Sequence, residues 1–324
     1  MNMYGEMMSY YGLTRDLDKA EYFETEAFEK TLLSLKTAIA SGGIIAMTGI
    51  VGSGKTMALR RMQEVLKDES KFVFCKALAT DKRQVNVNTL FTALFSDLPT
   101  EKDFKIPTKP EKRERILQEL IQKVKKPIVL FIDEAHELHG RTLVGLKHLI
   151  ETVEEARGIL AIVVVGHPRL GNELRKPSME EVGARAKIFN LDAIGGNQLQ
   201  YIEWILDKCS LPNVSPRDIV SREAMELLAE RLITPLQINH YLTQALEKGY
   251  EAGSKPIDTE MIEIVLSPDL NAIGPRLARH GYGITALCEH LNARHAEVRS
   301  YLCGQLGPGK TEEFNREIHK LGIL

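Results

Sequence analysis

Several features that would assign the chain to a familiar class of protein are missing from its sequence. The four cysteines lie far apart and form no C-x-x-C pair: Cys75, Cys209, Cys288 and Cys303. This spacing argues against a zinc site and against a disulfide framework, and it suits a reducing compartment. No apolar run reaches the roughly 18 residues of a membrane span, and the N-terminal stretch 1–11 lacks the basic-then-apolar order of a signal peptide. We therefore expect a cytoplasmic protein without membrane contact.

An excess of charge of either sign is missing too. The 324 residues carry a formal net charge of −2, so any contact with nucleic acid must come from a local patch. With 44% hydrophobic and 27% charged residues, the composition is that of a globular protein. The length allows two domains, or one large domain with an appendage.

What the sequence does contain is a phosphate-binding motif. Residues 49–56, GIVGSGKT, match the pattern G-x-x-x-x-G-K-[ST]. The motif follows an apolar run at 43–47 and precedes a helix-compatible run at 57–66, so a strand, a glycine loop and a helix N-terminus are expected in order. The residues predicted to bind nucleotide are Gly49, Gly52, Ser53, Gly54, Lys55 and Thr56.

The residue types in this loop fit a nucleoside triphosphate and its metal ion. Glycines let the backbone take positive φ values and lie against the phosphates, whose charge the loop N–H groups and the helix dipole stabilise. Lys55 is expected to reach the β- and γ-phosphates, and the Thr56 hydroxyl is expected to bind Mg²⁺. We therefore predict ATP and Mg²⁺ as cofactors.

An acidic motif is expected to complete the same site. The apolar run at 128–132 ends in Asp133 and Glu134, which predicts a buried parallel strand of the Walker B type. Asp133 would hold Mg²⁺, and Glu134 would act as general base on the attacking water. The letters Asp-Glu-Ala-His also occur in helicases, but the chain shows no second set of helicase motifs. His136 and His139 are therefore interpreted as helix-start residues.

Two further residues are candidates for catalysis. A second buried strand is predicted at 159–165, and His167 just beyond it would contact the γ-phosphate or the lytic water, unless it is a simple turn residue. Arg185 precedes a short strand-like segment at 188–191. It is either a surface charge or an arginine finger that reaches the γ-phosphate of a neighbouring subunit.

The rest of the chain is predicted to be helical. Apolar periodicity indicates helices at 201–209, 222–232, 236–252 and 259–266, and residues 267–282 are typical of a linker. Two short helices are then predicted at 284–291 and 295–302, with the turn spacing of a helix-turn-helix. Arg294 and Arg299 would face DNA phosphates or base edges, unless this hairpin serves packing or oligomerisation.

This series of motifs resembles the AAA+ ATPases. Within them, the chain looks most like the transposition regulators of the TnsC/TniB type, relatives of MuB and IstB, with the secretion ATPase ExeA as the nearest rival. The likeness covers roughly residues 10–266. It rests on the two nucleotide motifs and on YGL at 11–13, GHPRL at 166–170, Arg185 and TPLQIN at 234–239.

The fold implied is α/β: an AAA+ P-loop core with a parallel sheet, followed by a helical lid and a small helical C-terminal segment. The expected boundaries are 1–192 for the core with its N-terminal extension, 193–266 for the lid, and 267–324 for the linker and the helix-turn-helix-like segment. Aromatic residues of the first 26 positions, such as Tyr22 and Phe23, either pack against the core or cover an adenine base.

The function implied is that of an ATP-dependent DNA-binding ATPase that assembles as a ring or helical filament on duplex DNA. It would mark target sites for a transposase, together with a target-selection protein. ATP would lie between subunits, with Arg185 supplied by the neighbour, and Lys82 and Arg83 would contact DNA. The chain departs from the family pattern at two positions. His167 replaces Gln, Asn or Thr, and Leu236 replaces the sensor arginine of ExeA-like proteins, which favours slow, regulatory hydrolysis.

Two alternatives stay open. An ExeA-like secretion or assembly ATPase would act on protein partners, and a monomeric NTPase switch would carry a DNA-binding tail. DNA binding with and without an ATP analogue separates the first from the main prediction, and sizing in the presence of ATP separates the second.

Overall fold

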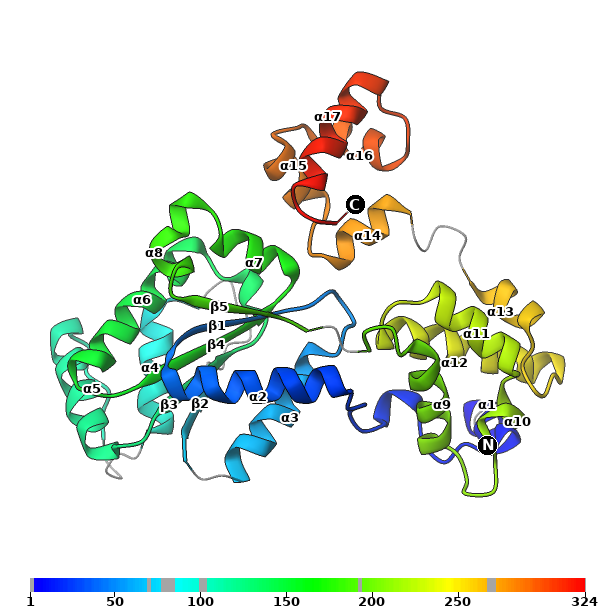
Figure 1. Cartoon of the computed structure of the whole chain (residues 1–324), viewed down its shortest axis with the longest axis horizontal. Helices are drawn as coiled ribbons and strands as arrows, with labels where there is room; N and C mark the ends of the chain where they lie inside the picture. Colours follow the sequence, from blue (N-terminus) through cyan, green and yellow to red (C-terminus); the bar gives the residue numbers. More distant parts are fainter. Residues whose placement is uncertain are drawn as a thin grey trace.

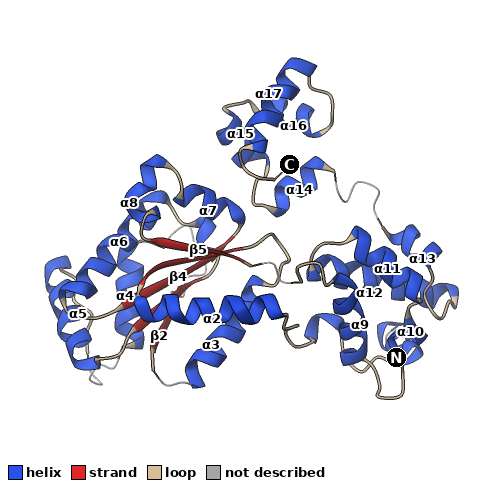
Figure 2. Ribbon diagram, viewed as in Figure 1, coloured by secondary structure: helices blue, strands red, loops and turns tan. Residues whose placement is uncertain are grey.

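A five-stranded parallel sheet forms the centre of the α/β part of the molecule, on the left in Figure 2. The computed structural model describes residues 3–68, 71–76, 85–98, 104–191, 194–266 and 272–323. The strand order is β2-β3-β4-β1-β5, and every neighbouring pair is parallel. The strands are β1 (Gly43–Thr48), β2 (Val73–Lys76), β3 (Ile128–Ile132), β4 (Leu160–Gly166) and β5 (Ala186–Asn190).

The inner strands are apolar along their whole length because helices cover both faces of the sheet. Every residue of β3 and β4 is buried, which confirms the two buried strands predicted from continuous apolar runs. Burying each branched side chain stabilises the fold by about 1.5–3 kcal/mol. The edge strand β5 is only partly buried, so its sequence shows a weaker apolar pattern than the inner strands do.

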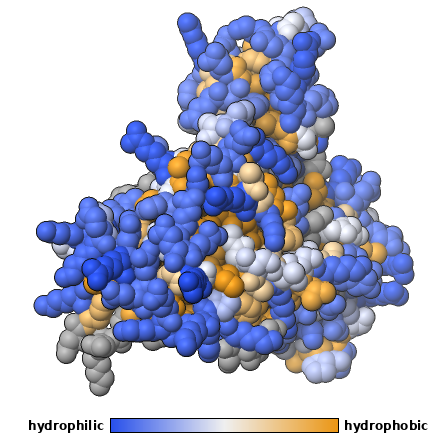
Figure 3. Space-filling view, turned by 60° about the vertical axis from the view of Figure 1, so that its left-hand side comes forward, coloured by the Kyte–Doolittle hydropathy of each residue, from blue (hydrophilic) through white to orange (hydrophobic). Residues whose placement is uncertain are grey.

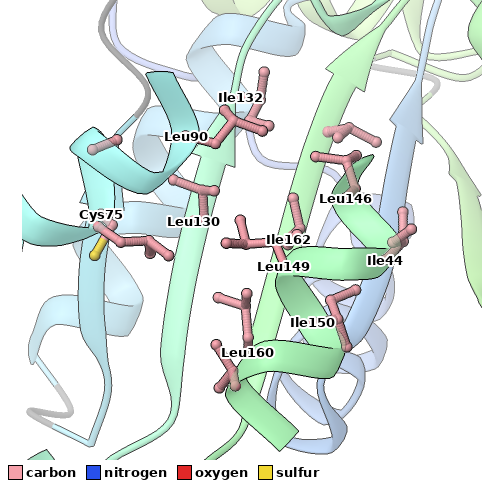
Figure 4. Close-up of a cluster of buried hydrophobic side chains, with 14 of the residues drawn as sticks. Ile44, Cys75, Leu90, Leu130, Ile132, Leu146, Leu149, Ile150, Leu160 and Ile162 are labelled. Carbon is pink, nitrogen blue, oxygen red and sulfur yellow. The ribbon is translucent and has the colours of Figure 1, made fainter. Parts of the chain in front are cut away.

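Helices cover both faces of the sheet (Figure 1), and alternate residues of the strands contribute to a separate hydrophobic cluster on each face. On one face, α2 (Glu26–Ser41) and α3 (Lys55–Asp68) pack against side chains such as Ile45 and Met47 of β1. On the other face lie α4 (Val87–Asp97), α5 (Pro110–Val124) and α6 (Gly140–Glu155). Figure 4 shows this second cluster, in which Leu146 and Leu149 of α6 meet Leu130 and Ile162 of the sheet. Short elements complete this part: η3 (Ala135–Glu137), α7 (Pro168–Leu174), η4 (Pro177–Met179) and α8 (Glu180–Gly183).

A helical region follows the sheet, as predicted. It consists of α9 (Gln198–Cys209), α10 (Pro216–Ile219), α11 (Arg222–Arg231), α12 (Pro235–Ala252) and α13 (Thr259–Val265). The N-terminal α1 (Met3–Tyr11) and η1 (Leu17–Lys19) share its core, since Met7, Tyr11 and Leu17 are buried in the same cluster. The Tyr11 hydroxyl also donates to the carbonyl oxygen of Ser254 at 2.9 Å. The N-terminal segment therefore packs with the lid, whereas the domain boundaries expected from the sequence assign it to the ATPase core.

The C-terminal segment has a core of its own. It contains α14 (Ile273–Arg279), α15 (Ile284–Leu291), α16 (His295–Leu302) and α17 (Pro308–His319), packed around residues such as Leu277, Leu287 and Val298. The two helices of the predicted helix-turn-helix are confirmed. The linker prediction for 267–282 is wrong over α14, because Pro275 lies in the first turn of that helix, where proline is tolerated. We call residues 272–323 the C-terminal domain.

No helix in the described part of the chain combines the length and the apolar character needed to cross a membrane.

Candidate nucleotide site

The phosphate loop joins β1 to α3 in the geometry that the motif predicts. Gly52 and Gly54 have φ values of 80° and 81°, in the left-handed region that favours glycine. At Gly52 a side chain would also collide with the lid, because a Cβ there would lie 2.6 Å from Leu236 Cβ and 2.9 Å from Thr234 Oγ1. Glycine is therefore needed at this position for two independent reasons.

The charged residues of the two motifs converge at the carboxyl ends of β1 and β3. Lys55 Nζ donates to the carbonyl oxygen of Ile50 at 2.9 Å. Burial lowers the pKa of Lys55, while Asp133 and Glu134 act in the opposite direction. Thr56 Oγ1 donates to Asp133 Oδ2 at 3.3 Å, so the two predicted metal ligands are neighbours.

Glu134 has an uncommon backbone conformation for a non-glycine residue. Its φ of 55° places it in the left-handed region, which costs of order 1–3 kcal/mol. Its N–H donates to Asp133 Oδ1 at 2.8 Å, and its side chain lines the cavity beside Lys55. Strain at this position is the kind of outlier that clusters at functional sites, which supports a chemical role for Glu134.

A cavity of about 380 Å³ extends from the phosphate loop towards the lid. Its volume falls within the range of small-molecule sites. Much of its apolar lining comes from the N-terminal segment and the lid, namely Leu17, Ala20, Tyr22, Phe23, Ile194, Tyr201, Ile205 and Leu236. The expectation that Tyr22 and Phe23 lie near a base is compatible with this placement, while Tyr11 is fully buried in the lid core.

His167 lies at the phosphate end of the cavity and contacts a second histidine. The ring centroids of His136 and His167 are 3.8 Å apart. The pKa of His167 is lowered to about 4, mainly by burial and further by the nearby His136 and Lys55. The ring is therefore neutral near pH 7. The Nδ1 atoms of both rings and Ser53 Oγ are buried without a hydrogen-bond partner among the described residues. Such orphaned polar atoms beside a phosphate loop fit a site that a ligand completes.

The donor set suits a magnesium nucleotide. Mg²⁺ in phosphate-transfer sites is held by one or two protein oxygens together with substrate phosphates, and Thr56 and Asp133 provide such a pair. Among the described residues, no group of three His, Cys, Asp or Glu side chains is placed to hold a metal ion by itself. The residues therefore fit a metal that arrives with a phosphate ligand.

The lid touches the phosphate loop through the start of α12. Thr234 caps this helix, its hydroxyl accepting from the N–H of Gln237 at 3.3 Å, and the Leu236 N–H donates to the Gly52 carbonyl oxygen at 3.3 Å. Leu236 lines the cavity, so the position expected to carry a sensor arginine does face the nucleotide site. The stretch at 234–239 that suggested a transposition regulator is thus also a helix-capping box packed on the loop.

The C-terminal domain touches the phosphate loop from another side. The Val51 N–H donates to the carbonyl oxygen of Arg279 at 2.8 Å. Gly281, with φ of 88°, is so close to His167 that an added Cβ would lie 2.8 Å from His167 Cβ. Asn172 Nδ2 donates to the Tyr282 hydroxyl at 2.8 Å, which extends the contact to α7. Sequence reasoning missed this contact, because no local pattern signals a pairing across more than 100 residues.

The remaining predicted site residues lie elsewhere. Arg185 is exposed and pairs with Glu151 at 3.4 Å. It precedes Ala186, the partner of Ile44 at the amino end of β1, so the length of that strand, roughly 16 Å at about 3.3 Å per residue, separates it from the phosphate loop. Lys82 and Arg83 lie outside the described residues. Arg294 and Arg299 are exposed on or just before α16. His139 caps α6, as expected for a helix-start residue.

Part of the chain is similar in sequence to a known protein family and to a curated protein. Residues 39–174 match the family model of the AAA domain. General secretion pathway protein A of Aeromonas hydrophila is 27% identical over 147 residues, which cover 44% of this chain and 26% of the relative. The chain thus spans about a quarter of the length of that curated relative.

Solved structures resemble nearly the whole chain. Aeropyrum pernix ORC2 in its ADPNP–ADP complexes has a TM-score of 0.59 at 14% identity and covers 96% of this chain and 91% of its own. Pyrobaculum aerophilum Cdc6p has a TM-score of 0.54 at 16% identity, with 97% and 90% covered. Drosophila ORC bound to DNA has a TM-score of 0.53 at 15% identity, with 99% and 84% covered. At these identities the likeness concerns the fold.

Proposed function

We propose that this chain, whose residues 39–174 match the family model of the AAA domain, is an AAA+ protein that binds and hydrolyses ATP and uses the nucleotide to control its contact with duplex DNA. The observation that carries the proposal is the hydrogen bond from Val51 to Arg279. It ties the phosphate loop to a domain that contains a helix-turn-helix, so a change at the loop reaches that domain directly.

The residues of the site suit ATP hydrolysis. Lys55 and the loop N–H groups hold the β- and γ-phosphates. Thr56 and Asp133 would hold Mg²⁺, and the ion would neutralise phosphate charge. Glu134 accepts the proton of the attacking water, and the neutral His167 ring orients that water or donates to the γ-phosphate. Because Leu236 stands where a sensor arginine is expected, we predict slow ATP turnover, which would set the lifetime of the ATP-bound state.

The C-terminal domain is the part best suited to a polyanion. Arg294 and Arg299 are exposed and form no ion pair with any residue that the structure describes. Lys82 and Arg83 remain candidates for further DNA contacts. The likeness to the DNA-bound Drosophila ORC fold over 99% of the chain supports the same proposal. Contacts of this kind go mainly to phosphates, so binding should depend strongly on salt.

The proposal includes assembly into a homo-oligomer, in which Arg185 would act on the nucleotide of a neighbouring subunit. This arginine lies at the opposite end of β1 from its own phosphate loop, so as a finger it would serve a neighbouring subunit. Arg185→Ala should then leave ATP binding intact and remove turnover in the assembled protein. A variant that turns over normally would show that Arg185 is a surface charge paired with Glu151.

A narrower version of the proposal is target selection for a transposase, in a ring or filament with a target-selection protein. It rests on the sequence resemblance to regulators of the TnsC/TniB type. The capping role of Thr234 and Gln237 gives a structural explanation for part of that resemblance, so the transposition role rests mostly on the other stretches.

A second candidate is an assembly ATPase that acts on protein partners. The similarity to general secretion pathway protein A, 27% over 147 residues, favours it. In that case the C-terminal domain would bind protein, and no duplex would be needed for nucleotide-dependent assembly.

The test is electron microscopy and sizing of the full chain with a slowly hydrolysed ATP analogue, with and without duplex DNA. Rings or filaments that require both ligands would support the DNA-dependent ATPase. Assembly with analogue alone, unchanged by DNA, would favour the protein-directed alternative. A monomer under all conditions would leave only a nucleotide switch.

A further inference from the structure

A polar network of two buried residues and one exposed carboxylate lines the nucleotide cavity. Asn239 Nδ2 donates to Asp18 Oδ1 at 3.0 Å, and the Tyr201 hydroxyl donates to Asn239 Oδ1 at 3.0 Å. Tyr201 and Asn239 are only 6% and 8% exposed. All three residues line the cavity, although they come from η1, α9 and α12.

The network fixes the direction of each hydrogen bond. Burial raises the pKa of Tyr201, so its hydroxyl stays protonated and donates. Asn239 must then turn its oxygen to Tyr201 and its amide nitrogen to Asp18. The other oxygen of Asp18 accepts no hydrogen bond from the residues that the structure describes. Asp18 therefore presents to the cavity a group that only accepts.

The surroundings of Asp18 suit a flat, largely apolar ring. Leu17, Ala20, Phe23 and Ile205 line the same cavity as Asp18. A base bound here with its triphosphate on the loop would have apolar contacts over its faces, and the cavity offers it the carboxylate acceptors of Asp18 and Glu21.

We propose that Asp18 selects adenine, by accepting a hydrogen bond from the exocyclic N6 amino group. This inference rests on the proposed binding of ATP. Guanine carries a carbonyl oxygen at the corresponding position, which a carboxylate repels. Its own N1–H and N2–H donors need two acceptors side by side, and Asp18 has already committed one oxygen to Asn239.

The test is competition of ATP and GTP, each with Mg²⁺, for binding to the full chain and to its Asp18→Asn variant. In the variant, Asn239 still donates, so the new amide accepts with its oxygen and turns its N–H₂ group to the base. That group donates to guanine O6 and opposes adenine N6. We expect ATP affinity to fall about tenfold or more, since a hydrogen bond to a charged group is lost, and GTP affinity to hold or rise.

Asp16→Asn is the matched control. Asp16 lies two residues earlier, pairs with Lys19 at 2.5 Å and does not line the cavity. Asp16→Asn should leave the ratio of ATP affinity to GTP affinity unchanged. Tyr201→Phe removes the hydroxyl that orients Asn239. It should reduce the ratio of ATP affinity to GTP affinity, but by less than Asp18→Asn does.

The outcomes separate the two proposals. If the unmodified chain binds ATP well and Asp18→Asn keeps the same ratio, the selection role of Asp18 is wrong while the ATPase proposal stands. A preference for GTP in the unmodified chain would likewise overturn the inference. If the unmodified chain binds neither nucleotide, both proposals fail together.

Discussion

The lid and the C-terminal domain are both helical, and both are hydrogen-bonded to the phosphate loop at consecutive residues. The lid contributes the Leu236 N–H to the carbonyl oxygen of Gly52, and the C-terminal domain contributes the Arg279 carbonyl oxygen to the N–H of Val51. A shift of this loop would therefore change the contacts of the lid and of the C-terminal domain together. A change in bound nucleotide could thus reach either body through its hydrogen bond to the loop.

The two bodies differ in charge. Residues 194–266 carry eleven acidic and six basic side chains, while residues 272–323 carry five acidic and seven basic ones. Figure 3 shows the C-terminal domain standing above the rest of the molecule, with a largely hydrophilic visible face. An acidic lid repels a polyanion and a basic domain attracts it. Both bodies contact the phosphate loop, whereas only the charge of the C-terminal domain suits the proposed contact with DNA.

Glu134→Gln should have the largest effect, because it removes the general base while keeping the shape of the site. We expect turnover to fall by about 100-fold or more. ATP binding should persist, so that lid and C-terminal domain are both held in the ATP state. Phosphate release and nucleotide titration measure the two quantities. Glu137→Gln, in the same short segment, is the control; rapid turnover in Glu134→Gln would refute the assignment of the base.

The difference in charge can be tested by paired substitutions. Replacing Arg294 and Arg299 by alanine should weaken duplex binding about tenfold and reduce the slope of log affinity against log salt by about 2. The same change at Lys208 and Lys248, two exposed lysines of the lid, should leave both quantities unaltered. Fluorescence anisotropy at several salt concentrations measures them. Equal losses from the two pairs would remove the distinction between the bodies.

Gly281→Ala should weaken the contact of the C-terminal domain with the nucleotide site and leave the contact of the lid intact. The left-handed φ of 88° and the 2.8 Å approach to His167 leave no room for a methyl group, so we expect a cost of about 1–3 kcal/mol to docking of the C-terminal domain. Hydrogen exchange over α14 and α15 should increase while exchange over α12 stays the same. Gly309→Ala, where nothing lies within 4 Å, is the control. Unchanged exchange in Gly281→Ala would contradict the docking contact.

The smallest expected effect is a pH dependence at His167. Its pKa of about 4 in the folded chain is below the ordinary value of 6.5, so the unfolded chain takes up a proton that the folded chain excludes. Stability should therefore fall as the pH drops from 6.5 towards 4, and it should be insensitive to this group above 6.5. Urea unfolding at pH 7.5 and 5 should show a smaller difference in His167→Asn than in the unmodified chain. An identical pH difference in both proteins would show that the ring is not held neutral by the fold.

Local patterns predicted much of the fold and the phosphate end of the site. A glycine loop between a strand and a helix has few other interpretations, and a continuous apolar run ending in two acids predicted β3 and its carboxylates. In contrast, the role of Asp18 depends on Asn239, 221 residues away, and no periodicity connects them. The docking of Arg279 and Gly281 likewise depends on tertiary contacts. The sequence does not predict helix α14, because Pro275 favours a linker although it lies in the first turn of that helix.

The most direct test of the central claim is the affinity of the full chain for duplex DNA with and without a non-hydrolysable ATP analogue. If the phosphate loop controls the C-terminal domain, the analogue should raise duplex affinity by about fivefold or more, and Lys55→Ala should abolish the difference. The same duplex affinity with and without bound analogue, in a chain shown to bind the analogue, would contradict nucleotide control of DNA contact.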